Sequence, residues 1–444
     1  MEEFGKYTLL QKLGQGGMAE VFLASEPISK NLTRFVVVKR ILPHISEDQN
    51  FITLFLDEAR LVSQLNHPNI AIVYDFGEID GEYYIAMEYI NGPTLSKFIK
   101  SARKFGGVPL SHALYIIEQV LNGLYYAHTK KDPYGNPLNI IHRDISPQNI
   151  LISREGAVKL VDFGVAKSNI QQHYTVAGTF KGKYSYLAPE VCLKKPWDQR
   201  VDLWAIGVVL YEILYGRPLF KKSNELATLQ AIINQPIPPI TELRPEVPKV
   251  VEEFLKKALE RDPDKRFQSA EEMLLKLEEV IDETRVRSST IRLKKYLERL
   301  INESEELRAY MEIHDSIEKR SLFMNLIPDT VESFSESQPT APDGFIKLKE
   351  EYEDKKKDTV KMKAPIGIDE FYEDNREETV EEERKFVSDR YNYEDELELK
   401  KTLKYGSPIV ENKLYIKRKK IAIIAMLILL VIIFSLIIYL FLNP

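Results

Sequence analysis

The C-terminal end of the chain carries the feature that most limits how this sequence can fold. Residues 421–442 read IAIIAMLILLVIIFSLIIYLFL and contain no charged residue. A helix rises 1.5 Å per residue, so a helix over this run spans roughly 30 Å, about the thickness of a bilayer's hydrocarbon core. The run therefore predicts one transmembrane helix. A buried core helix is the alternative, but core helices of this length usually keep a polar face.

Charged residues around this run predict its orientation. Residues 417–420 are all basic and directly precede it, and such flanks stay on the cytoplasmic side of a membrane. The first residues, MEEFGKYTLLQKL, lack the apolar stretch of a secretory signal, and a single cysteine, Cys192, fits a reducing compartment. We expect a single-pass protein of the inner (cytoplasmic) membrane, with its N-terminal part in the cytoplasm and its C-terminus outside.

The rest of the chain divides into three zones. The chain is 44% apolar and 29% charged, and residues 7–280 are long enough to bury a large core. Residues 283–326 are polar with apolar residues at helical spacing, which predicts either a dimerising coiled coil, and so a homodimer, or a helix packed on the preceding domain. Residues 327–416 are highly charged and predict a largely disordered linker. The net charge of −6 gives no indication of nucleic-acid binding.

A glycine-rich turn separates the first two predicted strands, residues 7–13 and 21–24. Glycines in such a turn let the backbone approach phosphate groups and direct N–H groups at them. A dinucleotide-binding fold would need a helix directly after the turn, whereas VFLA is typical of a strand. The candidate nucleotide-binding residues of this turn are Leu13, Gly14, Gln15, Gly16, Gly17, Met18, Ala19, Glu20 and Val21.

A lysine lies in the middle of the next predicted strand. Lys39 belongs to the β-prone run FVVVKRI, and residues 51–65 have the spacing of a helix that carries Glu58. A lysine in such a strand either faces solvent or holds a cation toward phosphates. In the second interpretation, Glu58 pairs with Lys39 across the interface between strand and helix.

Carboxylates and an amide gather in two later segments, IIHRDISPQNILIS (140–153) and VKLVDFGVAK (158–167). Phosphoryl transfer from ATP needs a divalent cation, and Mg²⁺ takes oxygen ligands. It also needs a carboxylate that orients the attacking hydroxyl and accepts its proton. Asp144, Asn149 and Asp162 supply this set. The segments therefore predict ATP and Mg²⁺ as cofactors, with Mn²⁺ as a substitute, whereas a purely structural loop cluster is the alternative.

Taken in order, these motifs resemble the bacterial form of the eukaryotic-like serine/threonine protein kinase family over residues 7–280. The resemblance implies an α+β fold with two lobes, a small β-rich N-lobe and a larger helical C-lobe. It implies that Asp144 is the catalytic base, that Asn149 and Asp162 bind metal, and that Lys39 holds phosphates. The following positions also match the family: Glu88 and Ile90 at the adenine-binding hinge, Ala188-Pro189-Glu190 after the activation segment, Asp202 at a buried helix start, and Arg266 as the partner of Glu190.

The chain departs from the family pattern at three places. Ala19 stands at the third glycine position, and residues 129–139 are longer than the usual connection. The family usually has lysine two residues after the catalytic aspartate and threonine shortly before Ala-Pro-Glu. This chain has Ser146 and Lys183 at those positions. Our hypothesis is that the hydroxyl and the ammonium have exchanged places, so that Lys183 supplies the catalytic cation with Ser146 as its partner; a solvent-exposed Lys183 is the alternative.

The resemblance also implies a switch. In the family, an arginine such as Arg143 receives a phosphate on the activation segment, which orders that segment. Counting back from Ala188 gives Thr179 as the primary phosphosite candidate, with Thr175 and Ser168 as secondary candidates. An ordinary exposed threonine is the alternative for Thr179.

The function predicted from the sequence is a membrane-tethered signalling kinase that phosphorylates serine and threonine in protein substrates and activates itself by autophosphorylation. Two other classes stay open. One is a membrane scaffold that binds ATP or partners without catalysis. The other is a small-molecule kinase, although the activation segment and the Asp202 helix favour a protein substrate.

Overall fold

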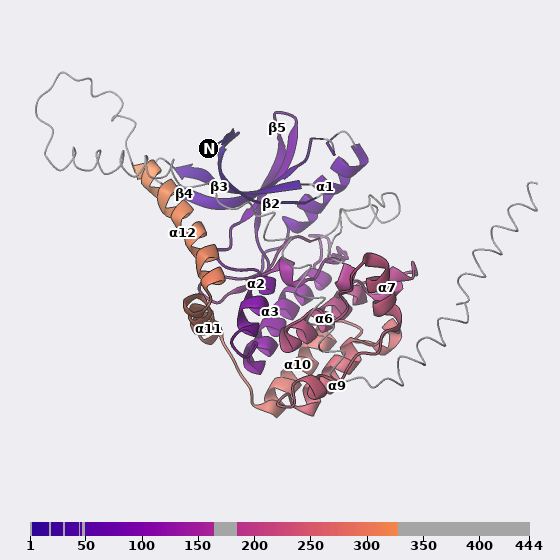
Figure 1. Ribbon diagram of the computed structural model, residues 1–444. Helices are drawn as coiled ribbons and strands as arrows, with labels where there is room; N and C mark the ends of the chain where they lie inside the picture. The colour runs from indigo at the N-terminus through magenta and orange to yellow at the C-terminus, as the bar shows by residue number, and fades with distance from the viewer. Residues whose placement is uncertain are drawn as a thin grey trace, which may run out of the picture. The chain divides into compact units, whose positions relative to one another are not determined.

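A computed structural model of the chain describes residues 2–16, 19–29, 32–43, 45–46, 49–163 and 184–326 (Figure 1). The chain divides into two units, and all described residues belong to the first, Met1–Gln338. Within the described residues, no helix is both long enough and apolar enough to cross a bilayer. The predicted linker at 327–416 and the predicted membrane span at 421–442 lie outside the described residues.

The N-terminal lobe is an antiparallel sheet with one helix. Its sheet order is β1-β2-β3-β4-β6-β5, and α1 covers it in Figure 1. Apolar residues alternate along β4, where Val36 and Val38 are fully buried. Asp80 and Gly81, with φ of 51° and 84°, make the tight turn that joins β5 to β6. The elements are β1 (Glu2–Phe4), β2 (Tyr7–Gln15), β3 (Ala19–Ser29), β4 (Leu32–Ile41), α1 (Gln49–Val62), β5 (Val73–Ile79) and β6 (Glu82–Glu88).

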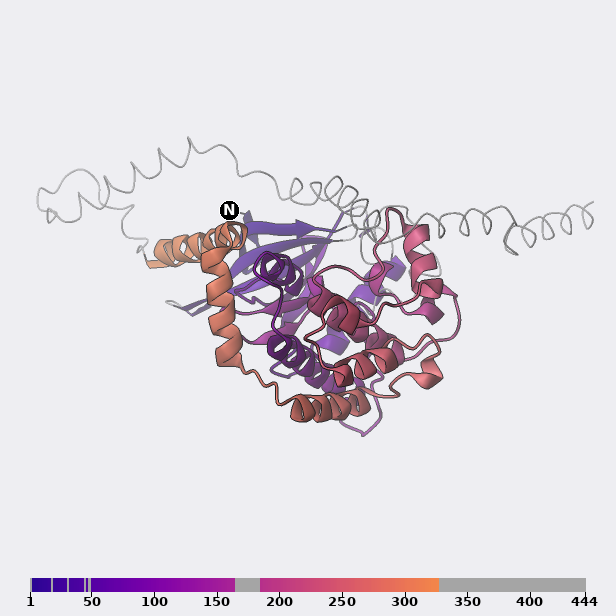
Figure 2. The ribbon, with the colours of Figure 1, turned by 60° about the horizontal axis from the view of Figure 1, so that its bottom comes forward.

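The C-terminal lobe is mainly helical and is built around α6. Nearly every residue of α6 is buried, including Trp204, because the helix is apolar on all sides and the other helices surround it (Figure 2). A two-stranded sheet, β7 (Ile150–Ile152) and β8 (Val158–Leu160), lies at the top of this lobe and carries the candidate catalytic residues at its ends. The helices are α2 (Leu95–Arg103), α3 (Leu110–Thr129), η1 (Pro147–Asn149), η2 (Tyr184–Tyr186), α5 (Pro189–Cys192), α6 (Arg200–Tyr215), α7 (Glu225–Asn234), α8 (Ile240–Leu243), α9 (Lys249–Ala258), η3 (Pro263–Lys265), α10 (Ala270–Thr284), α11 (Thr290–Glu303) and α12 (Glu305–Leu326).

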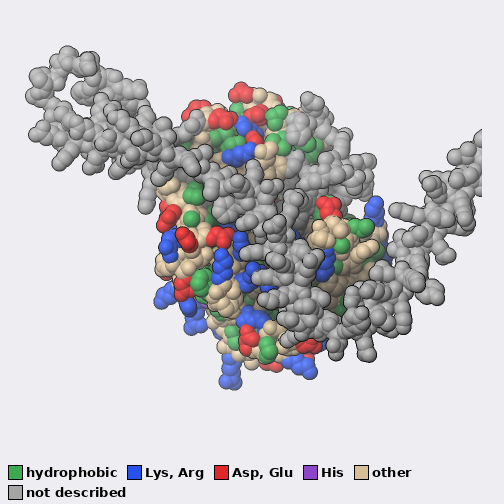
Figure 3. Space-filling model, viewed as in Figure 1, with side chains coloured by type: hydrophobic (Ala, Val, Ile, Leu, Met, Phe, Trp, Pro, Cys, Tyr) green, Lys and Arg blue, Asp and Glu red, His purple; other side chains and the backbone are tan. Residues whose placement is uncertain are grey.

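The segment 283–326 forms the end of α10 and the helices α11 and α12. Leu293, Leu297 and Leu300 of α11 are 0–1% exposed and belong to the core of the large lobe. This apolar face is therefore occupied within the chain, which favours the packed helix over the dimerising coiled coil. On the surface, acidic and basic side chains lie beside one another where α12 borders α2 (Figure 3).

The connection between the lobes is held against β7 by backbone contacts. Ile152 donates its N–H to Pro93 O at 3.0 Å, and Arg154 donates its N–H to Asn91 O at 2.8 Å. Between these contacts, a Cβ on Gly92 would lie 1.9 Å from Ile152 O. Glycine is required here because the two backbones approach more closely than a side chain allows.

We expect Gly92→Ala to destabilise the protein, because the added methyl group must push a carbonyl of β7 away from the hinge. Overpacking of this kind costs on the order of 1–3 kcal/mol in the free energy of unfolding. Urea denaturation measures it, with Gly14→Ala as the control, since a Cβ at Gly14 meets nothing within 4 Å. Equal unfolding midpoints for the two variants would contradict the proposed close approach.

Candidate active site

A buried carboxylate fixes the loop that carries Asp144. Asp202, in the first turn of α6, is 1% exposed and accepts hydrogen bonds from the backbone N–H groups of His142 and Arg143, both at 2.8 Å. His128 Nε2 lies 2.9 Å from the same carboxylate. Burial raises the pKa of Asp202, but the hydrogen bond with His128 and the contacts with His142 more than offset it, so the net pKa is lowered. The ionised carboxylate thus fixes the loop backbone at His142 and Arg143.

His142 joins this loop to the segment that carries Asp162. The imidazole is fully buried, and its Nδ1 accepts the N–H of Asp144 at 3.3 Å. Its Nε2 lies 3.2 Å from Val161 O, so the neutral ring carries its proton on Nε2 and donates it there. The ring also packs on Phe163, with 4.4 Å between ring centroids. The histidine of the motif therefore has a structural role between two functional loops.

Asp144 and Asn149 form a pair at the end of the loop. Asn149 is 4% exposed, and its Nδ2 donates to Asp144 O at 2.9 Å and to Asp144 Oδ2 at 2.7 Å. Asn149 O in turn accepts the N–H of Val161 at 3.0 Å. Because the amide nitrogen is committed to Asp144, the amide oxygen is the atom that Asn149 offers to a cation.

An ion pair connects the two lobes at this site. Lys39 Nζ of β4 lies 3.0 Å from Asp162 Oδ1, with the side chains 23% and 34% exposed. The cation expected to hold phosphates therefore lies beside a carboxylate expected to bind metal. For Glu58, the structure describes the helical backbone but not the side chain, so the predicted Lys39–Glu58 pair stays a prediction.

Two residues flanking this cluster have left-handed backbone conformations. Arg143 has φ of 64° and Asp162 has φ of 56°, and neither is glycine. Such conformations cost on the order of 1–3 kcal/mol and are found preferentially at functional sites. For Arg143, the hydrogen bond from its N–H to Asp202 helps to hold this conformation, and its guanidinium lies over the ring of Trp197 at 5.3 Å.

The donor set fits a nucleotide-bound divalent cation. Within the described residues, no group of three or more His, Cys, Asp or Glu side chains could enclose a metal ion. Mg²⁺ is commonly bound by one or two protein oxygen ligands together with substrate phosphates. The carboxylate of Asp162 and the amide oxygen of Asn149 are ligands of that type, so the residues present suit Mg²⁺ held jointly with ATP.

The glycine-rich turn lies next to Lys39 in the sheet. Val21 pairs with Gly14 on one side and with Lys39 on the other, and Gly16 donates its N–H to Ala19 O at 2.8 Å. Ala19 is 7% exposed, so its methyl group packs inward. Gly17 and Met18, at the tip, lie outside the described residues. Strand pairing therefore brings the candidate phosphate-binding turn beside the candidate phosphate-binding cation.

At the hinge, the side chain of Glu88 makes polar contacts within the protein. Its carboxylate lies 2.7 Å from Lys159 Nζ and accepts the N–H of Ile72 at 3.1 Å. Ile90 is 6% exposed. The predicted use of the Glu88 and Ile90 backbones by adenine stays a prediction.

Ser146 is a buried hydroxyl in the loop between Asp144 and Asn149. It is 1% exposed, and within the part of the chain that the structure describes its Oγ has no hydrogen-bond partner. Its hypothetical partner Lys183 lies outside the described residues, as do the phosphosite candidates Thr179, Thr175 and Ser168.

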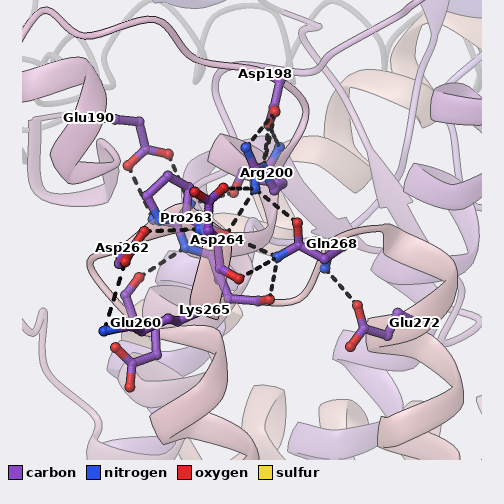
Figure 4. Close-up of polar contacts among 11 residues, drawn as sticks. Glu190, Asp198, Arg200, Glu260, Asp262, Pro263, Asp264, Lys265, Gln268 and Glu272 are labelled. Atoms are coloured by element: carbon purple, nitrogen blue, oxygen red, sulfur yellow. Dashed lines mark hydrogen bonds and ion pairs between the residues drawn. The ribbon is translucent and has the colours of Figure 1, made fainter.

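The predicted pair of Glu190 and Arg266 is confirmed. Arg266 donates to both carboxylate oxygens of Glu190, at 2.9 and 3.1 Å, and the two side chains are 4% exposed or less. Arg266 also donates to the backbone oxygens of Arg200 and Glu260. Figure 4 shows the polar cluster around Glu190 and Arg200 to which this pair belongs. The pair of Glu190 and Arg266 ties the segment after the activation region to the start of α6.

Sequence reasoning missed two buried contacts. One is the contact between His128 and Asp202. A histidine at the end of a helix does not by itself indicate that its partner is a buried carboxylate. The other is Tyr186, whose hydroxyl donates to Glu212 Oε2 of α6 at 2.7 Å. Burial outweighs the hydrogen bond from Tyr186 and the charge of Lys221, which both lower the pKa of Glu212, so this pKa is raised to about 7.

This raised pKa predicts a pH dependence of stability. The folded protein binds the Glu212 proton more tightly than the unfolded chain does, whose value is near 4.5, so this contribution to stability is full below pH 4.5 and is lost as the pH rises through about 7. We expect Glu212→Gln, which cannot ionise, to gain up to about 3 kcal/mol relative to wild type between pH 5 and pH 8. Chemical denaturation at both pH values measures the difference. Glu253→Gln at an exposed position is the control, and parallel curves for Glu212→Gln and wild type would contradict the assignment.

The comparisons with known proteins agree with this geometry. Residues 7–276 match the family model for the protein kinase domain. The chain is 41% identical over 284 residues to the tyrosine-protein kinase MasK of Myxococcus xanthus, covering 64% of this chain and 44% of that protein. It is 35% identical over 282 residues to the serine/threonine-protein kinase PrkC of Bacillus subtilis, covering 64% and 41%.

Among solved structures, the kinase domain of Mycobacterium tuberculosis PknI is 27% identical, covering 63% of this chain and 97% of that chain with a TM-score of 0.48. The chain spans less than half the length of MasK and PrkC. The match to the family model extends over more than half of the chain, and the protein therefore belongs to the protein kinase family.

Proposed function

We propose that the protein is an ATP-dependent protein kinase that transfers a phosphoryl group from Mg-ATP to serine or threonine hydroxyls of protein substrates. The observation that carries this proposal is the convergence of Lys39 from the small lobe with Asp162, Asn149 and Asp144 from the large lobe. Relatives named serine/threonine-protein kinase, such as PrkC of Bacillus subtilis, support the choice of acceptor.

Each residue has a role that its contacts suit. Asp144, oriented by Asn149, accepts the proton of the attacking hydroxyl and directs its oxygen. Asp162 and the amide oxygen of Asn149 would hold Mg²⁺ or Mn²⁺, which neutralises phosphate charge when bound. Lys39 holds the phosphates from the side of the sheet, and the backbones of Glu88 and Ile90 hold the adenine. Glu58 orients Lys39 in this proposal.

Transfer to tyrosine is a second candidate, and one observation favours it. MasK of Myxococcus xanthus, the relative with 41% identity, is named a tyrosine-protein kinase. Against this, residues 147–149 read Pro-Gln-Asn, which resembles the serine/threonine form of the catalytic loop. The acceptor is therefore a question for phosphoamino-acid analysis.

We further propose that a helix over residues 421–442 holds the kinase on the cytoplasmic face of the inner membrane, with the C-terminus outside. The uncharged run and its basic flank at 417–420 support this orientation. Tethering raises the local concentration of kinase, which favours autophosphorylation between neighbouring copies. Thr179 is the proposed primary acceptor, with Thr175 and Ser168 as secondary acceptors and Arg143 as the partner of the phosphate.

A finer proposal concerns Ser146 and Lys183. A buried hydroxyl without a hydrogen bond costs stability, and Ser146 Oγ has no partner within the described residues. A lysine from the segment before Ala188 would satisfy this hydroxyl and add a positive charge near the transferred phosphate. This supports the exchange of the two residue types between the two loops.

Phosphotransfer by the full chain tests the main proposal. With γ-labelled ATP and Mg²⁺, we expect wild type to label itself or a general protein substrate, and Asp144→Asn to lose at least about 100-fold of that rate. Asp80→Asn makes the same change in the β5–β6 turn and should keep full activity. Label on serine or threonine supports the first candidate and label on tyrosine the second, whereas nucleotide binding without any label would favour the scaffold alternative.

The exchange hypothesis makes a separate prediction. Ser146→Lys and Lys183→Thr should each lose most of the activity, because the first buries a second cation and the second removes the one that acts. The double variant restores the usual family arrangement and should recover much of the rate. Phosphotransfer by the three variants measures this, with nucleotide binding as the control for folding. A double variant no more active than the single variants would reject the exchange.

A further inference from the structure

Beyond residue 276, where the match to the family model ends, the chain completes α10 and continues as two helices, of which α11 contacts α2 of the large lobe and α12 contacts α2, β2 and β4. The first of them, α11, is part of the large lobe. Its apolar residues Leu293, Leu297 and Leu300 follow helical spacing and are 0–1% exposed. The hydroxyl of Tyr296 donates to Gly107 O at 3.0 Å, and its ring packs on Phe98 and His112. α11 is therefore held firmly on the large lobe, and α12 begins from this fixed position.

The junction between α11 and α12 is also fixed. Ser304 lies between the helices and is 4% exposed. Its N–H donates to Leu300 O at 2.8 Å, and its Oγ accepts the N–H of Leu307 at 3.2 Å, so one residue ends α11 and caps α12. Leu307 and Met311, in the first half of α12, are 2% and 1% exposed. The direction in which α12 leaves the large lobe is thus determined by buried contacts.

Polar contacts hold the first half of α12 on α2. Glu306 lies 3.0 Å from Lys100 Nζ and 3.5 Å from Lys104 Nζ, and Lys97 Nζ lies 4.0 Å from the centre of the Tyr310 ring. Burial raises the pKa of Glu306, but the hydrogen bond from Lys100 and the positive charges of both lysines lower it overall. Exposed pairs of this kind contribute little each, so they direct the helix more than they stabilise it.

One turn later, α12 reaches the connection between the lobes. Asp315 Oδ2 lies 2.6 Å from a guanidinium nitrogen of Arg154, and the side chains are 30% and 35% exposed. Arg154 is the residue whose backbone N–H donates to Asn91 O in the hinge. Asp315 is therefore linked to the hinge through Arg154.

Beyond this point, α12 runs alongside the small lobe. It contacts β2 and β4, and both ribbon views show it beside the sheet (Figures 1 and 2). β2 leads into the glycine-rich turn at Gly14 and Gly16, and β4 carries Lys39. A helix anchored on the large lobe thus contacts the two strands of the small lobe that present the groups expected to hold phosphate.

We propose that α12 is a strap that sets the position of the small lobe over the large one for nucleotide binding, and that Asp315 is a positioning residue in it. The inference rests on the proposed function, because its effect is on the ATP site. By holding β2 and β4, the strap favours the arrangement in which Lys39 lies beside Asp162. Loss of the strap lowers the population of that arrangement, and the apparent affinity for nucleotide falls by the same factor.

The experiment exchanges the charges of the ion pair in the full chain. The variants are Asp315→Arg, Arg154→Asp and the double variant, and the readout is the dissociation constant of a non-hydrolysable ATP analogue with Mg²⁺. We expect each single variant to bind about three- to tenfold more weakly, as the loss of a partly exposed ion pair and the approach of like charges imply. The double variant should recover most of the affinity. Glu312→Arg, an exposed position on the same helix, is the matched control and should bind as wild type does.

A second readout separates positioning from general stability. Amide hydrogen exchange in β2 and β4 should increase in Asp315→Arg and not in Glu312→Arg, while the thermal midpoint of the two variants stays similar. If Asp315→Arg fails to fold, Asp315→Asn replaces it, because it removes the charge without repulsion. Wild-type affinity in both single variants, or a double variant that binds as weakly as they do, would overturn the proposal. The binding measurement does not depend on phosphotransfer. A protein that binds nucleotide but transfers no phosphate would therefore refute the proposed function, and the affinities of the variants would still test the strap.

Discussion

The candidate active site depends on one buried carboxylate. Asp202 lies in the first turn of a helix that is apolar on every side, and it accepts two backbone N–H groups of the loop that carries Asp144. Moving a carboxylate into such surroundings is costly unless hydrogen bonds and nearby positive charge compensate. Here His128 of α3 and two backbone N–H groups of the loop share this role, so the loop conformation offsets part of the cost of burial. This explains why Arg143 keeps a left-handed backbone conformation that is unfavourable in isolation.

From this anchor, rigid contacts extend outward through the large lobe. His142 accepts the N–H of Asp144 within the loop, and it joins the segment of Asp162 by a ring contact with Phe163 and one hydrogen bond to Val161 O. The buried pair of Glu190 and Arg266 ties the other side of the site to the base of α6. A buried ion pair adds little net stability compared with an apolar substitute, but breaking it is strongly unfavourable. The pair therefore holds the segment of Glu190 against the start of α6.

The small lobe is held by a different set of contacts. At the site, the partly exposed pair of Lys39 and Asp162 joins the lobes, and at the hinge the close approach at Gly92 restricts the connection. Neither contact by itself fixes the angle between the lobes. A helix that packs on α2 of the large lobe and also contacts β2 and β4, as α12 does, is the kind of element that can do so.

Much of the site could be predicted from the sequence by itself. The useful patterns were the glycine spacing, a lysine in a β-prone run, and the order of Asp144, Asn149 and Asp162. Each of these patterns can be recognised from short segments of the sequence. The pairing of Glu190 with Arg266 was also predicted, through resemblance. Tertiary structure alone decided that Lys39 lies beside Asp162, that His128 contacts Asp202, that Glu212 is buried against Tyr186, and that Asp315 reaches Arg154. These contacts join residues far apart in the chain, and no local pattern encodes such distances. They arise because tertiary packing brings together elements that are distant in the sequence.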